Sequence, residues 1–284
     1  MGRLIPAMLV VVFCVTFLTG FGTPKEVPTL MLDWLVEDRV KEVFEPLGSL
    51  PEYSYEATHA PDSSTQSDTV HVELTLKSDH FTAVNACNCT YVYDKSSGLW
   101  TLTRGGKWNA PIVLSYDGGP FTAEAVKEAF GNHGFKLNDS SFSEASAEDL
   151  ERLTTVEYAN KIIDAWLMDQ MDDDGEIMCA NFKSTDYETA KELYPNLIRQ
   201  IFGRIDLTGE DVKEFGPFEG DNYSLYGFSG TLYGSNVTTY YVCVDEYIFV
   251  TLGSFEKDKG LQFDQAIYEL GILPLAQIMT GRIS

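Results

Sequence analysis

The sequence predicts an α+β protein of two small domains, each an antiparallel sheet packed against helices. Three observations predict this class: residues 29–47 have helical periodicity, residues 70–76 alternate between apolar and polar side chains, and residues 120–273 mix both patterns. Hydrophobic residues make up 44% and charged residues 22% of the chain. This is the composition of a protein that buries a core, and it disfavours both wholesale disorder and a polytopic membrane protein.

The first expected domain covers residues 29–115 and opens with a helix. Apolar side chains recur at helical spacing in residues 29–47, with charged residues between them. Thr29 is placed to cap this helix and Gly48 to end it. Residues 70–76 then predict a half-buried antiparallel strand, because every second side chain is apolar.

A hairpin is expected to complete the first sheet. Residues 87–93 and 99–103 are its predicted strands, and residues 94–98 are polar and end in glycine, which favours a turn. Gly105 and Gly106 follow directly, and we expect them to break the ladder. The first domain is therefore predicted as one helix on a curved antiparallel sheet.

The second expected domain covers residues 120–273, after the turn-rich segment 115–120, and residues 274–284 form a tail. Thr122 is expected to cap a short helix, and Val126 of that helix faces the core. This helix opens a domain with its own alternation of helices and strands.

A hairpin with an acidic tip is predicted next. Residues 138–151 are Ser-rich and acidic, which favours a loop before it. Residues 162–168 and 177–182 are its expected strands, and residues 172–175 form the turn. This turn partly matches a calcium-binding loop, but Asn181 stands where that loop needs a bidentate glutamate, so a hairpin turn is the preferred interpretation.

The rest of the second domain is a helix, three strands and a last helix. Thr185 and Glu188 are spaced as a capping box, Pro195 should kink the helix that they open, and Gly203 should end it. The three strands and the last helix are expected at residues 223–232, 237–244, 247–252 and 261–270. We expect one sheet with helices on one of its faces.

Residues 1–22 are predicted to be an export signal. Arg3 precedes the apolar residues 9–18, and Gly20 and Gly22 supply the small side chains that a signal peptidase requires. Cleavage is therefore expected after Gly22. The rest of the chain is expected outside the cytoplasm, secreted or associated with the cell envelope.

Two alternatives to cleavage are open. The apolar span 4–21 is at the short edge of what crosses a bilayer, so an uncleaved anchor would tie the protein to the membrane through these residues alone. Cys14 would be a lipid-attachment site only if a small residue preceded it, and Phe13 stands there.

The charge of the chain restricts its partners. The formal net charge is −23, so the chain repels phosphate backbones, and no nucleic-acid partner is expected. Residues 139–192 hold 15 acidic and 4 basic residues. This concentration is typical of a solvated face, and a basic protein or cationic peptide would meet it first.

Four cysteines follow the export signal. Cys87 and Cys89 lie on one face of a predicted strand at a separation unsuited to an unstrained bridge. Cys179 and Cys243 are the candidate disulfide of an exported chain. The alternative is four small buried side chains. No histidine lies near a cysteine at zinc-ligand spacing, and no metal or cofactor is expected.

Two short segments form a candidate interaction surface. One places two indoles and basic side chains around a glycine turn, which is typical of sugar-stacking or protein-contact edges, although Trp100 also fits as the core plug of a small sheet. The other is the acidic hairpin tip. The candidate residues are Trp100, Arg104, Trp108, Asp172, Asp173 and Asp174.

Short motifs in residues 120–273 resemble those of an uncharacterised family of small exported proteins and lipoproteins of Gram-positive bacteria. They comprise a helix that ends in a Gly-aromatic pair, an Ala-Lys helix, a strand with two tyrosines and a terminal Glu-Leu-Gly helix. The matching segments are residues 121–127, 134–135, 188–191, 222–226, 241–245 and 269–271. The resemblance implies a fold and an extracytoplasmic location, and it supplies no catalytic residues.

Two functions are compatible with the sequence. No Gly-x-Ser-x-Gly, His-Glu-x-x-His or phosphate-binding loop is present, so no catalytic residue is assigned. The favoured function is a non-catalytic binding module that presents an acidic surface to a protein, peptide or glycan. The alternative is an exported hydrolase that uses paired carboxylates, which a concave pocket holding two of them would favour.

Overall fold

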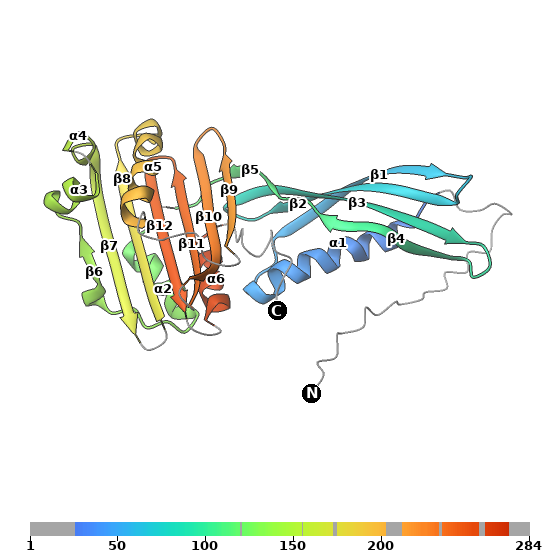
Figure 1. Ribbon diagram of the computed structural model, residues 1–284, viewed down its shortest axis with the longest axis horizontal. Helices are drawn as coiled ribbons and strands as arrows, with labels where there is room; N and C mark the ends of the chain where they lie inside the picture. The colour runs from blue at the N-terminus through green and yellow to red at the C-terminus, as the bar shows by residue number, and fades with distance from the viewer. Residues whose placement is uncertain are drawn as a thin grey trace. The chain divides into compact units, whose positions relative to one another are not determined.

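The computed structural model describes residues 26–119, 121–154, 156–172, 175–202, 212–232, 235–255 and 259–272. The predicted export signal lies outside these ranges. Within them, no helix combines the length and hydrophobicity that crossing a membrane requires. The chain folds as an α+β protein with two antiparallel sheets, which confirms the predicted class (Figure 1).

The chain forms two compact units that do not follow the expected boundary at residues 115–120. Residues 38–54 and 75–85 group with the residues that follow 110, in a C-terminal unit. The other described residues before 110, at 26–37, 55–74 and 86–109, form an N-terminal unit. Long elements pass from one unit into the other, and such a division has no local signal in the sequence. Whether residues 120–273 fold alone stays a prediction.

Helix α1 covers Thr29–Phe44 and continues as the 3-10 turn η1, Glu45–Leu47. The predicted helix is thereby confirmed. Gly48 ends it in the left-handed region, with φ of 84°, and its N–H donates to the Glu45 carbonyl. Thr29 is the first helical residue and not the residue before the helix.

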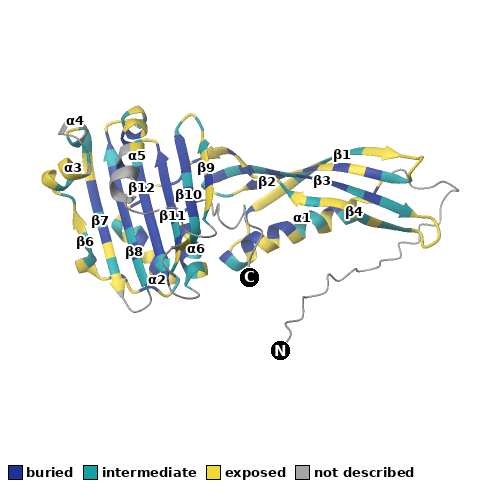
Figure 2. Ribbon diagram, in the orientation of Figure 1, coloured by how far each residue is buried: buried dark blue, intermediate teal, exposed yellow. Residues whose placement is uncertain are grey.

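The five-stranded sheet has the order β1-β2-β3-β4, and β5 pairs with β3. Its strands are β1 Glu52–Asp62, β2 Ser67–Lys77, β3 Phe81–Asp94, β4 Leu99–Trp108 and β5 Ile112–Tyr116. Strand β2 alternates between buried and exposed side chains as predicted. Strand β1, whose side chains are exposed or half-buried (Figure 2), was missed. Its half-buried residues Tyr55, Ala57 and His59 alternate with exposed polar ones, but none of them is a large aliphatic side chain, so the pattern is weak.

Gly105 and Gly106 do not break the ladder between β3 and β4. The pairing continues to Cys87 and Trp108, with register shifts on either side of Cys89. Gly105 has a φ of 91°, and a Cβ there would lie 2.0 Å from the Asn88 carbonyl oxygen. The glycine therefore allows a bulge in which the two backbones approach closely.

The seven-stranded sheet has the order β6-β7-β8-β12-β11-β10-β9, with every neighbouring pair antiparallel. Its strands are β6 Phe142–Glu144, β7 Ile162–Asp172, β8 Gly175–Ser184, β9 Lys213–Glu219, β10 Tyr223–Leu232, β11 Ser235–Val244 and β12 Tyr247–Phe255. The predicted strands are confirmed. Pairing of Asp172 with Gly175 also confirms the hairpin around the acidic turn.

Helices cover both faces of this sheet, so the expectation of helices on one face is wrong (Figure 1). On one face, α5 (Tyr187–Phe202) packs Leu193 and Leu197 into a core with Ile248 and Val250. On the other face, the ring of Phe263 in α6 (Gly260–Glu269) lies beside the rings of α2 (Ala123–Asn132) and β12. Two-sided burial explains why β11 and β12 are apolar at consecutive positions.

Residues 138–151 are not a plain loop. They contain the 3-10 turn η2 (Asp139–Ser141), strand β6 and most of helix α3 (Ala147–Leu153); the short α4 (Val156–Ala159) follows. Ser146 and Asp149 form a capping box in which each side chain accepts the other's backbone N–H. Ser146 and Asp149, two of the residues that favoured a loop, therefore cap helix α3.

Helix α5 is capped one residue later than expected. Thr185 was predicted as the cap, but the Asp186 carboxylate accepts the Thr189 backbone N–H at 2.8 Å. This hydrogen bond holds the pKa of Asp186 below its ordinary value. Thr185 instead donates its hydroxyl to Asp186.

The four cysteines within the described residues are buried free thiols, and the candidate disulfide between Cys179 and Cys243 is not formed. Cys179 pairs with Thr251 in the ladder, whereas Cys243 pairs with Ile248. Because Thr251 and Ile248 lie an odd number of positions apart on one strand, the two thiols point to opposite faces of the sheet. Burial raises the pKa of each thiol to about 12.

Candidate functional site

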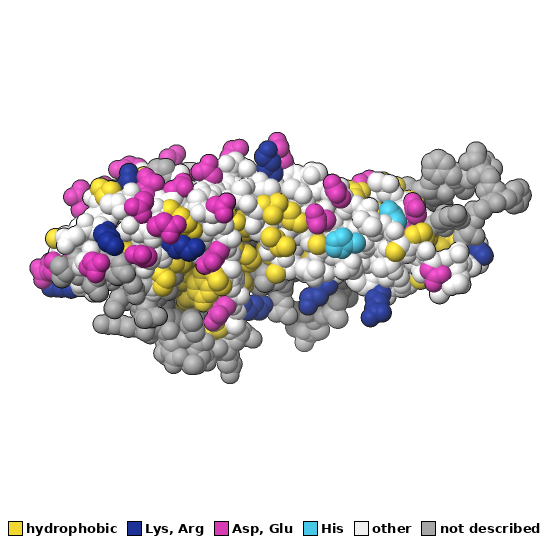
Figure 3. Space-filling view, turned by 90° about the horizontal axis from the view of Figure 1, so that it is seen from above, with side chains coloured by type: hydrophobic (Ala, Val, Ile, Leu, Met, Phe, Trp, Pro, Cys, Tyr) yellow, Lys and Arg dark blue, Asp and Glu magenta, His cyan; other side chains and the backbone are white. Residues whose placement is uncertain are grey.

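Acidic side chains dominate the part of the surface formed by α3 and α5. Figure 3 shows them spread over one face with few basic side chains among them. Glu151 and Glu188 are exposed there. The bases are engaged: Arg152 pairs with Glu148, and Lys161 lies 3.8 Å from Glu192. Such exposed pairs contribute little stability, and the net negative charge remains.

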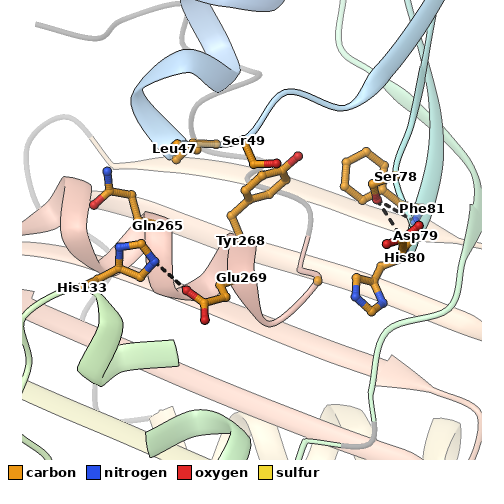
Figure 4. Close-up of a pocket in the computed structure, with 12 residues that line it drawn as sticks. Leu47, Ser49, Ser78, Asp79, His80, Phe81, His133, Gln265, Tyr268 and Glu269 are labelled. Atoms are coloured by element: carbon orange, nitrogen blue, oxygen red, sulfur yellow. Dashed lines mark hydrogen bonds and ion pairs between the residues drawn. The ribbon is translucent and has the colours of Figure 1, made fainter. Parts of the chain in front are cut away.

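A pocket of about 350 Å³ lies in the C-terminal unit (Figure 4). Its walls come from the turn after α1, the turn between β2 and β3, the end of α2, and α6. The lining residues are Leu47, Gly48, Ser49, Ser78, Asp79, His80, Phe81, His133, Gln265, Tyr268, Glu269 and Gly271. This volume is in the range of small-molecule sites.

The aromatic side chain of Tyr268 lines the pocket. Figure 4 shows Tyr268 between the His133–Glu269 pair and the turn that carries His80. The ring centroid of Tyr268 lies 5.7 Å from that of Phe44 and 6.4 Å from that of Phe81. Burial raises the pKa of Tyr268 to about 12, so the hydroxyl is protonated at neutral pH. The packing fixes the ring while the hydroxyl can donate or accept.

Glu269 is held in place by two donors from the end of α2. His133 Nε2 lies 2.8 Å from Glu269 Oε2, and Asn132 Nδ2 donates to Oε1 at 2.7 Å. Because a carboxylate only accepts, the hydrogen of neutral His133 is on Nε2. The Nδ1 lone pair of His133 is then an acceptor.

His80 is fixed in the same manner. Its Nδ1 lies 3.2 Å from the Asp117 carbonyl oxygen, so the hydrogen of the neutral ring is on Nδ1 and Nε2 is an acceptor. The Ser78 hydroxyl accepts the backbone N–H groups of His80 and Phe81, which shapes the turn. Gly271 lies against the ring, and a Cβ there would be 2.5 Å from two ring carbons of His80.

The tryptophan segment does not line this pocket. Trp100, Arg104 and Trp108 are all on β4, which belongs to the N-terminal unit. Trp100 is half-buried with its ring centroid 5.3 Å from that of Tyr93, and Arg104 is exposed. Trp100 therefore packs against Tyr93 without being part of the buried core, and a role of the segment in interactions stays a prediction.

The acidic hairpin tip lies largely outside the described residues. Asp173 and Asp174 are not described, and only the backbone of Asp172 is, at the end of β7. In the described ranges, no cluster of three or more His, Cys, Asp or Glu side chains is arranged to hold a metal ion. The role of the tip as an interaction surface stays a prediction.

The sequence did not predict the pocket. Its lining comes from segments more than 200 residues apart in the chain, such as Leu47 and Glu269, and no motif spacing connects them. His133 follows a predicted helix and precedes Gly134, whereas His80 lies between the predicted strands 70–76 and 87–93. Only the fold shows that these segments meet.

Comparisons with known proteins do not assign the chain to a family. No family model and no curated protein matches the sequence. Among solved structures, one match is to an N-terminal dehydratase from the difficidin assembly line, with 9% sequence identity over 84% of this chain and 88% of that chain. Its TM-score is 0.18, so this likeness carries no argument about fold or function.

Proposed function

We propose that the chain is an exported, non-catalytic binding protein of the cell envelope or secreted space, which captures its ligand in the C-terminal unit. The observation that supports this most is the pocket, whose lining holds two carboxylates and no Lys or Arg among its twelve described residues. The acidic surface would attract a positively charged protein or peptide toward the same unit. The resemblance to exported Gram-positive proteins in residues 120–273 agrees with the location.

The hydrolase alternative has less support from the geometry. Asp79 and Glu269 do line one pocket, as that alternative requires. However, Glu269 accepts from two side chains, and the Ser78 hydroxyl accepts two backbone N–H groups. Among the described lining residues, no hydroxyl hydrogen-bonds to a histidine ring, because the Ser78 hydroxyl meets only the backbone N–H of His80 and Phe81. No nucleophile is therefore paired with a base there. Turnover of a glycan, peptide or ester, lost on changing Asp79 or Glu269, would overturn the binding proposal.

Export can be tested at the N-terminus. If residues 1–22 are a signal, mass spectrometry of the protein from its host will find a chain that begins at or near Thr23, in the extracellular or envelope fraction. An intact Met1 in the cytosolic fraction would contradict export. An intact Met1 in the membrane fraction would support the anchor at residues 4–21.

Electrostatic capture predicts a strong dependence on salt. The screening length falls from about 10 Å at 0.1 M salt to about 3 Å at 1 M. Association of an oligolysine peptide with the purified chain, followed by stopped-flow fluorescence, should slow over this range. The triple change Asp172→Asn, Asp173→Asn and Asp174→Asn should reduce the association rate constant more than it raises the dissociation rate constant.

A matched variant controls for total charge. Glu52, Glu56 and Glu73 are exposed on the five-stranded sheet, and changing all three to glutamine removes the same charge from a different place. Association should change less in this variant than in the hairpin variant. Equal slowing in both would show that only net charge matters, and unchanged association at 1 M salt would contradict electrostatic capture.

A further inference from the structure

We propose that the pocket in the C-terminal unit binds a protonated amine, either a free organic amine or the side chain of a lysine in a peptide. The inference rests on the proposed binding function and names the class of ligand. It follows from the hydrogen-bonding groups, the charge and the aromatic ring that the pocket presents.

The pocket offers more acceptors than donors. In its neutral form, each ring of His80 and His133 donates one hydrogen within the protein and leaves its other nitrogen as an acceptor. Gln265 donates its amide nitrogen to the Pro46 carbonyl at 2.7 Å, which leaves its side-chain oxygen as a further acceptor. The hydroxyls of Ser49 and Tyr268 can serve in either role. A ligand rich in N–H donors complements this set.

The charge of the lining selects a cation. Asp79 is exposed at the rim, and Glu269 lies in the wall with both oxygens oriented by donors from α2. No Lys or Arg is among the described residues that line the pocket. An ammonium group would therefore gain charge-assisted hydrogen bonds, which are about twice as strong as neutral ones. A carboxylate or phosphate ligand would be repelled.

The aromatic ring gives a third reason. A cation within about 6 Å of an aromatic ring centroid is attracted to the face of the ring. Tyr268 lines the pocket, and its ring packs beside those of Phe44 and Phe81, which fixes its position. The volume of about 350 Å³ accepts an alkyl chain behind the ammonium group.

Isothermal titration of the purified full chain tests the proposal with matched probes. n-Hexylamine should bind, and hexanoate and hexanol, which keep the alkyl chain, should bind at least tenfold more weakly. The peptide Gly-Lys-Gly, against the same peptide with an acetylated lysine side chain, tests the peptide source. Equal affinity for hexylamine and hexanoate would overturn the proposal. Binding of only one amine probe would assign the source.

Variants locate the binding site. Asp79→Asn and Glu269→Gln keep the shape of each side chain and should each weaken hexylamine binding at least tenfold. Glu128→Gln, an exposed change on α2 outside the pocket, should not. Unfolding midpoints confirm that each variant is folded. Unchanged hexylamine binding in both pocket variants would overturn the assignment.

The test separates this inference from the proposed function. If neither hexylamine nor Gly-Lys-Gly binds but oligolysine still associates in a manner that depends on the hairpin acids, the pocket inference fails and the binding function stands. If neither probe binds and a substrate is turned over, the proposed function fails as well.

Discussion

Replacement of Phe249 by alanine is expected to lower the free energy of unfolding by about 3–5 kcal/mol, because it empties a fully buried site in the centre of the larger sheet. Phe249 is 0% exposed on β12, and its ring stacks on Phe121 with centroids 4.4 Å apart. Urea unfolding at equilibrium, with the slope compared between variants, measures the loss.

Leu261 provides the control for this change. It is an apolar residue of α6 that is 37% exposed, so Leu261→Ala removes less buried area and should cost about 1 kcal/mol or less. Equal losses at Phe249 and Leu261 would contradict the two-sided packing of the seven-stranded sheet.

Replacement of Gly271 by alanine should damage both stability and the pocket. Gly271 has a φ of 77°, and an added Cβ would lie 2.5 Å from ring carbons of His80. The left-handed backbone alone costs about 1–3 kcal/mol for a residue with a side chain. The His80 ring must also move, so hexylamine binding should weaken. Urea unfolding and titration with hexylamine measure the two effects.

The same substitution at Gly131 should have the opposite sign. Gly131 lies within α2, and a Cβ added there would meet no atom of a neighbouring segment within 4 Å. Gly131→Ala should therefore stabilise the chain by up to about 1 kcal/mol through helix propensity. Destabilisation by both changes, or by neither, would contradict the role given to Gly271.

Helices and strands with a regular apolar pattern on one buried face could be predicted from the sequence. Val70, Val72, Leu74 and Leu76 face one core, and their alternation located β2. By contrast, β1 alternates only between exposed and half-buried positions, and Ala57 and His59 on its half-buried face give a weak apolar signal. Periodicity finds an element only where one side of it is buried against an apolar layer.

Packing between distant segments was not predictable from local patterns. The consecutive apolar residues of β11 are typical of a strand that is buried on both faces, so the sequence does indicate that helices cover both faces of the sheet. The opposite orientation of Cys179 and Cys243 depends on the register of three strands, which spacing along the chain does not determine. The pocket likewise forms only where the turn after α1, the turn between β2 and β3 and the end of α2 meet beside α6, and no local pattern indicates this.

Determining the structure of the chain bound to n-hexylamine would test the central claim most directly. The account predicts the amine nitrogen within about 3 Å of a carboxylate oxygen of Asp79 or Glu269, with the alkyl chain beside Tyr268. Hexylamine bound elsewhere at saturation, with this pocket left unoccupied, would contradict it.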